Sequence, residues 1–217
     1  MFVGHYSVSF AAKRLAPSLP IGLLFIAVQL LDVGWSLLVL LGVEKVRIVP
    51  GITASNPFDL YYMPYTHGLL AALLWSAGGA LLYRLFSPGA SRKVLLILGL
   101  AVFSHWVLDF IVHRPDLPLY DDAAKVGLGL WNHPAIAFSL ETALLFGGMA
   151  LYIRAAAPRP IPTIVFGLVM LAIQAYVFFG PPPVSPAAAA LTALGSYVVF
   201  ALVMAYLDRR RALPATT

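Results

Sequence analysis

The sequence contains no cysteine, and only 11% of its 217 residues are charged. The absence of cysteine excludes disulfide bonds and thiolate metal sites, so any bound metal ion would need histidine and carboxylate ligands. About a quarter of the residues of a soluble domain are charged and about half are apolar. Here 61% are hydrophobic. These proportions predict an integral membrane protein.

Six apolar runs are long enough to cross a bilayer, which takes about 20 residues in a helix. They cover approximately residues 19–41, 67–86, 94–112, 134–153, 161–179 and 187–207, with prolines near their ends. Residues 3–14 form a shorter segment that cannot span. We therefore predict an all-α fold, a polytopic transmembrane helical bundle of about six spans with a short N-terminal half-helix.

The whole chain, residues 1–217, is predicted to be a single membrane domain. Residues 1–113 contain most of the candidate functional groups, and residues 114–217 supply mainly supporting helices. The first long run contains Asp32 and lacks a small-residue cleavage site, so we interpret it as a retained helix and not as a signal peptide.

The basic residues are distributed unevenly between the two sides of the predicted bundle. If residues 11–18 face the cytoplasm, that side has ten basic residues: Lys13, Arg14, Arg84, Arg92, Lys93, Arg154, Arg159, Arg209, Arg210 and Arg211. The opposite side has four: Lys45, Arg47, Arg114 and Lys125. Cytoplasmic loops of membrane proteins carry such an excess, so both termini are predicted to be cytoplasmic. The net charge of +5 is then a topology signal, and no nucleic-acid partner is predicted.

The third apolar run carries polar side chains at helical spacing. His105, Asp109 and His113 occupy positions i, i+4 and i+8, which lie about 40° apart in succession on an α-helix and so form one stripe. Polar groups are costly against lipid, so the stripe should face the protein interior. This spacing is typical of neighbouring metal ligands on a helix, and hydrogen bonds between helices are the alternative use.

The predicted topology brings further candidates to the level of this stripe. His67 begins the second span, and Asp32 lies about 15 Å below the outer end of the first span, at about 1.5 Å per residue. His5 is near the start of the half-helix and could meet Asp32. We therefore predict metal ligands in the extracytoplasmic half of the bundle: His5, Asp32, His67, His105, Asp109 and His113. His133 directly precedes Pro134, where helix capping or an interfacial role competes with metal binding.

Two further acids are candidates for proton transfer. Glu141 lies two turns into the fourth span, where a buried carboxyl could act as a proton carrier or general base, or could form a hydrogen bond to a neighbouring helix. Asp59 lies in the long outer loop of residues 43–66, which contains several tyrosines and is predicted to cover the bundle at the membrane surface.

The order of these residues resembles a bacterial family of membrane-bound metal-dependent hydrolases, related to a LexA-regulated inner-membrane protein. That family has a histidine near the N-terminus, an aspartate in the first apolar segment, a Thr-His pair and a Ser-His-x-x-Leu-Asp motif. The matching positions are Gly4-His5, Leu31-Asp32, Thr66-His67 and Ser104-His105-Trp106-Val107-Leu108-Asp109. The chain departs from the family in having a single acid in its first segment and Tyr62-Met63-Pro64 in place of His-Arg-Gly.

The resemblance covers about residues 4–113 and implies a hydrolase of the bacterial cytoplasmic membrane. We expect one or two divalent ions, most simply Zn²⁺, to activate a water that attacks an ester or phosphoester. The expected partner is a membrane lipid or a lipid-linked substrate from the extracytoplasmic leaflet. A proton- or metal-ion-coupled transporter and a non-catalytic protein with a structural metal are the alternatives, and the oligomeric state is left open.

Overall fold

The computed structural model describes residues 1–156 and 160–209. Within these ranges the chain forms eight α-helices, two 3-10 helices and two β-strands. In chain order they are η1 (Val3–His5), α1 (Tyr6–Leu15), α2 (Ile21–Val28), α3 (Leu30–Leu40), β1 (Lys45–Ile48), β2 (Phe58–Tyr62), α4 (Leu69–Phe86), α5 (Arg92–Val112), η2 (Leu130–Asn132), α6 (Pro134–Ala156), α7 (Pro160–Phe179) and α8 (Pro186–Arg209). The predicted all-α class is confirmed.

The helices of the described residues include five that are long and apolar enough to cross a membrane, namely α4, α5, α6, α7 and α8. Together, α2 and α3 could form a sixth span, but the two are bent by 57° at Gln29. The prediction of about six spans is therefore confirmed, with the first span broken in its middle. This arrangement is consistent with an integral membrane protein.

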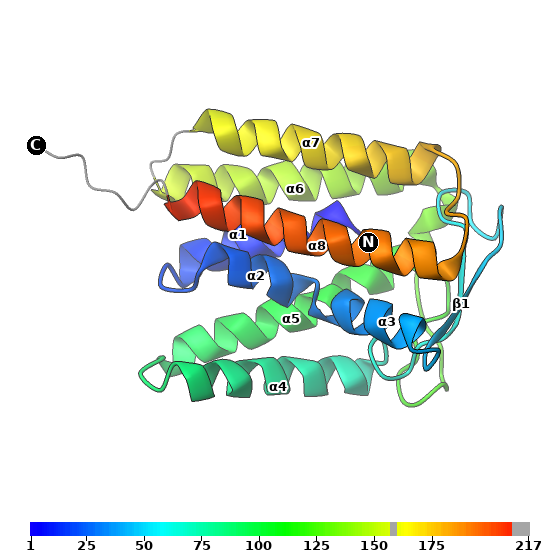
Figure 1. The fold of residues 1–217 in the computed structure, drawn as a ribbon, viewed down its shortest axis with the longest axis horizontal. Helices are drawn as coiled ribbons and strands as arrows, with labels where there is room; N and C mark the ends of the chain where they lie inside the picture. The colour runs from blue at the N-terminus through cyan, green and yellow to red at the C-terminus, as the bar shows by residue number, and fades with distance from the viewer. Residues whose placement is uncertain (157–159, 210–217) are drawn as a thin grey trace, which may run out of the picture.

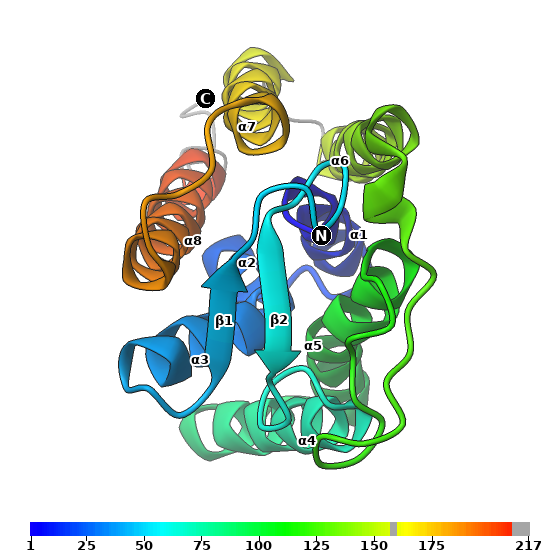
Figure 2. The same cartoon turned by 90° about the vertical axis from the view of Figure 1, so that its right-hand side faces the viewer.

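The bundle surrounds the N-terminal segment. The long helices lie roughly along one axis (Figure 1), and the view down that axis places α1 and the N-terminus in the middle of the other helices (Figure 2). Tyr6 and Phe10 of α1 are fully buried and belong to the main apolar core. The segment predicted as a half-helix is thus packed at the centre of the bundle, and its first turn, η1, is buried there.

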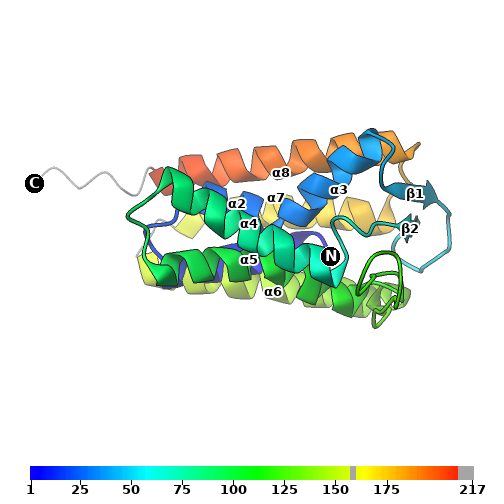
Figure 3. The ribbon, with the colours of Figure 1, turned by 90° about the horizontal axis from the view of Figure 1, so that it is seen from below.

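One end of the bundle is covered by irregular structure, and we call it the loop end. There, β1 and β2 form an antiparallel pair in which Arg47 lies opposite Asp59, and residues 113–133 fold beside them (Figure 3). Trp35, Val46 and Leu60 are buried in a second apolar cluster beneath this cover. The outer loop of residues 43–66 therefore contains a β-hairpin, which its composition did not predict.

The basic residues divide between the two ends as the sequence indicated. Lys45 and Arg47 lie on β1 at the loop end, whereas the turn between α4 and α5 lies at the opposite end of the bundle (Figure 1). At that opposite end Lys13 forms an ion pair with Asp208, with Nζ and Oδ2 3.2 Å apart. Arg159, Arg210 and Arg211 lie outside the described residues. Which end faces the cytoplasm stays a prediction.

Candidate metal centre

The six side chains predicted as metal ligands come together in one cluster. The elements that contribute them are η1 for His5, α3 for Asp32, the turn before α4 for His67, α5 for His105 and Asp109, and the C-cap of α5 for His113. All are buried except Asp32, whose side chain is 15% exposed. The cluster therefore brings together residues as far apart in the sequence as His5 and His113, which are separated by 108 positions.

Asp109 is the centre of the cluster. Its Oδ2 lies 3.1 Å from His105 Nε2, 3.5 Å from His113 Nε2 and 3.6 Å from His67 Nε2. Its Oδ1 lies 3.2 Å from His5 Nε2 and also forms an ion pair with the amino group of Met1. Four imidazoles therefore present the same ring nitrogen to one carboxylate.

Asp32 extends the cluster toward α8. Its Oδ1 lies 3.2 Å from His67 Nε2 and 3.6 Å from His105 Nε2, and its Oδ2 accepts a hydrogen bond of 2.8 Å from the Tyr197 hydroxyl. Two groups of side chains among the described residues have the spacing of a metal site: His5, His105 and Asp109, and Asp32, His67 and His105. Because His105 belongs to both, the two groups are parts of one centre.

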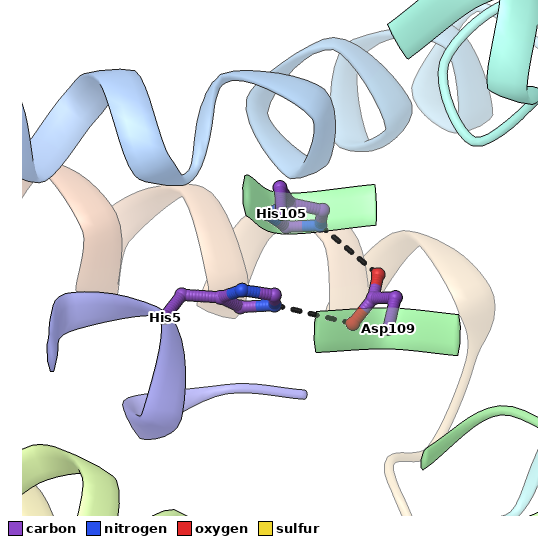
Figure 4. A group of neighbouring side chains, drawn as sticks. All are labelled: His5, His105 and Asp109. Carbon is purple, nitrogen blue, oxygen red and sulfur yellow. Dashed lines mark hydrogen bonds and ion pairs between the residues drawn. The ribbon is translucent and has the colours of Figure 1, made fainter. Parts of the chain in front are cut away.

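The rings of His5 and His105 lie face to face. Their centroids are 3.9 Å apart and their planes differ by 8°, so both rings point their Nε2 atoms at Asp109 (Figure 4). The N-terminal turn η1 thus brings His5 into the cluster.

The break between α2 and α3 determines which ring nitrogen of His105 carries a proton. His105 Nδ1 lies 2.7 Å from the carbonyl oxygen of Val28, the last residue of α2. Carbonyl oxygens at a helix C-terminus lack partners within the helix, and a carbonyl can only accept a hydrogen bond. Nδ1 therefore carries a proton, so in the neutral ring the Nε2 lone pair faces Asp32 and Asp109.

A short hydrogen-bonded chain orients His67 in the same way. Its Nδ1 lies 2.8 Å from the Thr66 hydroxyl oxygen, and that hydroxyl donates to Glu44 Oε2 at 2.7 Å. The backbone N–H groups of Tyr65 and Thr66 donate to Glu44 Oε1. Burial raises the pKa of Glu44, and the nearby His67 and these hydrogen bonds oppose that effect. With Glu44 ionised, Thr66 can only accept from His67, which leaves the Nε2 lone pair directed at the cluster.

His113 has a carboxylate partner outside the cluster. Its Nδ1 lies 2.9 Å from Asp116 Oδ1, and Asp116 also accepts from the Arg114 guanidinium at 3.2 Å. Burial lowers the pKa of His113, but Asp109 and Asp116 raise it overall. The Trp131 ring, with its centroid 4.2 Å from that of His113, covers the imidazole. Thus three of the imidazoles have Nδ1 held by an acceptor and Nε2 turned inward.

The other predicted functional residues lie outside this centre. Glu141 on α6 is fully buried, and its Oε2 accepts from the backbone N–H of Phe2 at 2.8 Å and of Gly4 at 3.2 Å. Asp59 forms ion pairs with Arg47 and Arg114. His133 is exposed at the C-cap of η2. Proton transfer by Glu141 or Asp59 stays a prediction.

The arrangement can bind a cation. Ionised carboxylates only accept hydrogen bonds, and here they face imidazole nitrogens whose lone pairs are also acceptors. The amino group of Met1, protons on the rings or a metal ion between the groups can supply the compensating positive charge. Outer acceptors that fix histidine tautomers are typical of metal ligands. Tyr197 and Glu44 were not predicted, because their roles depend on packing between distant elements. Comparisons with models of known protein families, with curated proteins and with solved structures found no match.

Proposed function

We propose that this chain is a membrane-embedded metal-dependent hydrolase that holds one or two Zn²⁺ ions at the Asp109 centre. The observation that carries the proposal is the orientation of His67, His105 and His113. Each has its Nδ1 held by an oxygen acceptor and its Nε2 within 3.6 Å of Asp109. Buried imidazoles and carboxylates arranged in this way need positive charge among them, and a metal ion would supply it beside the amino group of Met1.

The available donor atoms suit a zinc site. Imidazole nitrogens and carboxylate oxygens are the zinc ligands open to a chain without cysteine. His105 has one free ring nitrogen and so can bind one ion. A second ion would need the other oxygens of Asp32 and Asp109, since a carboxylate can bridge two metals.

The centre is least buried at Asp32. This residue is the least buried of the proposed ligands, with 15% of its side chain exposed, and the Tyr197 hydroxyl fixes its outer oxygen. When bound, Zn²⁺ lowers the pKa of a coordinated water to about 7 and makes it a nucleophile at neutral pH. The protein residues then orient the ion and exclude bulk water from the other sides.

The proposed substrate is an ester or phosphoester of a membrane lipid or lipid-linked compound. Two observations support this choice: the centre lies within a bundle of apolar helices, and the sequence resembles membrane-bound metal-dependent hydrolases. The proposed location is the bacterial cytoplasmic membrane, with the loop end outside the cytoplasm. Hydrolysis would add water across the ester bond and release an acid and an alcohol.

A cation-coupled transporter is the second candidate function. It is favoured by one observation: Asp109 and Glu141, two acids inside membrane helices, are both almost completely buried. Buried intramembrane acids often mark proton or ion paths. A transporter would show ion flux in liposomes that depends on Asp109, whereas the proposed hydrolase would not.

The metal content of purified protein tests the proposal. We expect at least one zinc per chain, measured by plasma mass spectrometry and located by anomalous scattering. His105→Ala should lose most of this metal, because it removes the ligand that both groups share. His133→Ala is the matched control, since this exposed histidine lies outside the cluster, and it should retain the metal.

Folding must be checked in parallel, by size-exclusion chromatography and circular dichroism. If His105→Ala is misfolded, Asp109→Asn replaces it, since the amide keeps the shape of the side chain but binds metal weakly. The proposal is wrong if the wild-type protein, purified without chelators and supplied with zinc, binds none.

A further inference from the structure

A groove of about 630 Å³ runs along the outside of α4. Leu30 of α3 forms one wall, and Gly68, Trp75, Gly78 and Leu82 follow the length of α4. Within the 18-residue apolar stretch of α4, only 11% of the residues are buried. The corresponding stretches of the other four candidate spans of the described chain are 28–39% buried. The groove therefore lies on the helix that presents most of its surface to lipid.

The groove is somewhat longer than the hydrocarbon part of one membrane leaflet. The helical rise from Gly68 to Leu82 is about 21 Å at about 1.5 Å per residue. One leaflet of a bilayer has a hydrocarbon thickness of about 15 Å, half of the core. A groove that begins at the loop end of α4 thus reaches past the membrane midplane, which suits one extended or slightly tilted acyl chain.

Polarity changes along the groove in the same sense as in a phospholipid. Tyr65, Tyr120 and Asp121 line it at the loop end, where tyrosines typically lie at the level of lipid headgroups. Apart from Pro64 and Trp75, the remaining lining is leucine, alanine and glycine, such as Leu74 and Gly79. The apolar part matches a hydrocarbon chain, and the phenol and carboxylate groups match a hydrated headgroup.

The polar end of the groove adjoins the metal centre. Gly68 directly follows His67, and Leu30 lies two residues before Asp32. Trp75, which lines the groove, and Thr66 both lie against Gly34 of α3, where an added Cβ would be 3.3 Å from the indole and 3.1 Å from the Thr66 methyl group. The loop end of the groove and the metal centre are thus neighbours along the chain at Gly68 and His67.

We propose that this groove binds an acyl chain of a phospholipid in the leaflet at the loop end. Its consequence for catalysis rests on the proposed function: the substrate of the hydrolase would be an acyl-chain lipid that enters sideways from the bilayer. Binding itself depends on the groove alone and not on the metal.

Photo-crosslinking of a lipid tests this directly. The protein is reconstituted in vesicles of phosphatidylethanolamine and phosphatidylglycerol that contain a small fraction of phosphatidylcholine with a diazirine in its acyl chain. After illumination, mass spectrometry of peptides should find labelling concentrated between Gly68 and Leu82. Gly78→Phe should reduce this labelling several-fold, because the glycine lines the groove and an added Cβ meets no atom within 4 Å in the described structure.

Gly195→Phe on α8 is the matched control. Gly195 is also an exposed helical glycine whose added Cβ would meet nothing within 4 Å of the described atoms, and this variant should label α4 like the wild type. The proposal is overturned if Gly78→Phe leaves α4 labelling unchanged, or if labels spread over α4, α6 and α7 alike. Labelling is also measured on His105→Ala, which should label in the groove like the wild type. A wild-type protein that binds no zinc but labels in the groove refutes the hydrolase and not the lipid site.

Discussion

Glu141 is placed to hold the N-terminal turn that carries His5. Its Oε2 accepts hydrogen bonds from the backbone N–H groups of Phe2 and Gly4, at 2.8 and 3.2 Å, and the turn η1 ends at His5. The carboxylate therefore positions a proposed ligand from a distance, whether or not it also carries protons. The two roles can be separated because positioning needs an acceptor oxygen, whereas proton transfer needs a titratable group.

We expect Glu141→Gln to bind metal with an affinity close to that of the wild type, since the amide oxygen can still accept both hydrogen bonds. Glu141→Ala should weaken metal binding by about 10- to 100-fold, the usual effect of removing a group that orients a ligand. Competition with a chromogenic chelator measures both affinities. Tight binding by the alanine variant would exclude the positioning role, and loss of turnover in a glutamine variant that keeps its metal would instead indicate proton transfer.

The residues of the centre could be predicted from the sequence better than the groups that orient them. His105 and Asp109 follow from helical spacing, and the unpaired Asp32 from its position inside an apolar run. The carbonyl of Val28 could not be predicted, because a backbone oxygen leaves no trace in composition. Glu44 could not be predicted either, since its contact with Thr66 depends on how the loop after α3 folds back.

At the scale of elements, the position of α1 depends on a close approach to α6. A Cβ added to Gly148 would lie 2.5 Å from the carbonyl oxygen of Ser7 and 2.6 Å from its Cα. Such contacts are too short for any side chain, so glycine allows the two backbones to touch. The adjacent Gly147 meets no atom within 4 Å in the described part of the chain.

Gly148→Ala should therefore separate α1 from α6 and destabilise the protein by about 1–3 kcal/mol, as overpacking of a tight core does. Its thermal unfolding midpoint in detergent should fall by several degrees, and metal affinity should fall with it because His5 moves. Gly147→Ala is the control for helix propensity and should leave both quantities unchanged or slightly raise the midpoint. Equal midpoints for the two variants would show that the close approach does not matter.

The break in the first span shows where sequence patterns fail at this scale. Residues 19–41 form a long apolar run with no proline or glycine next to Gln29, so hydropathy predicts a continuous helix. The structure bends there by 57°, and the side chain of Gln29 donates from Nε2 to the Phe2 carbonyl oxygen at 3.2 Å. Contacts with the inserted N-terminal turn thus accompany the break, and hydrophobic periodicity does not record such contacts.

For the whole molecule, charge and structure agree on two distinct ends. The loop end contains four basic residues: Lys45, Arg47, Arg114 and Lys125. The turn that joins α4 to α5 lies at the opposite end of the bundle, between Arg84 and Arg92. Hydropathy predicted the number of spans correctly because each long helix must satisfy its backbone hydrogen bonds within lipid. It could not predict which segment lies at the centre, since α1 is too short to be recognised as a span.

The orientation of the bundle can be measured because the chain has no cysteine of its own. Ala123→Cys places an exposed thiol at the loop end, and Gly89→Cys places one in the turn between α4 and α5. The excess of basic residues at the second end predicts that it faces the cytoplasm. A membrane-impermeant maleimide should therefore label Ala123→Cys in intact bacterial cells and Gly89→Cys only after the membrane is permeabilised. The reverse pattern would place the metal centre near the cytoplasmic surface, and a lipid substrate would then have to come from the inner leaflet.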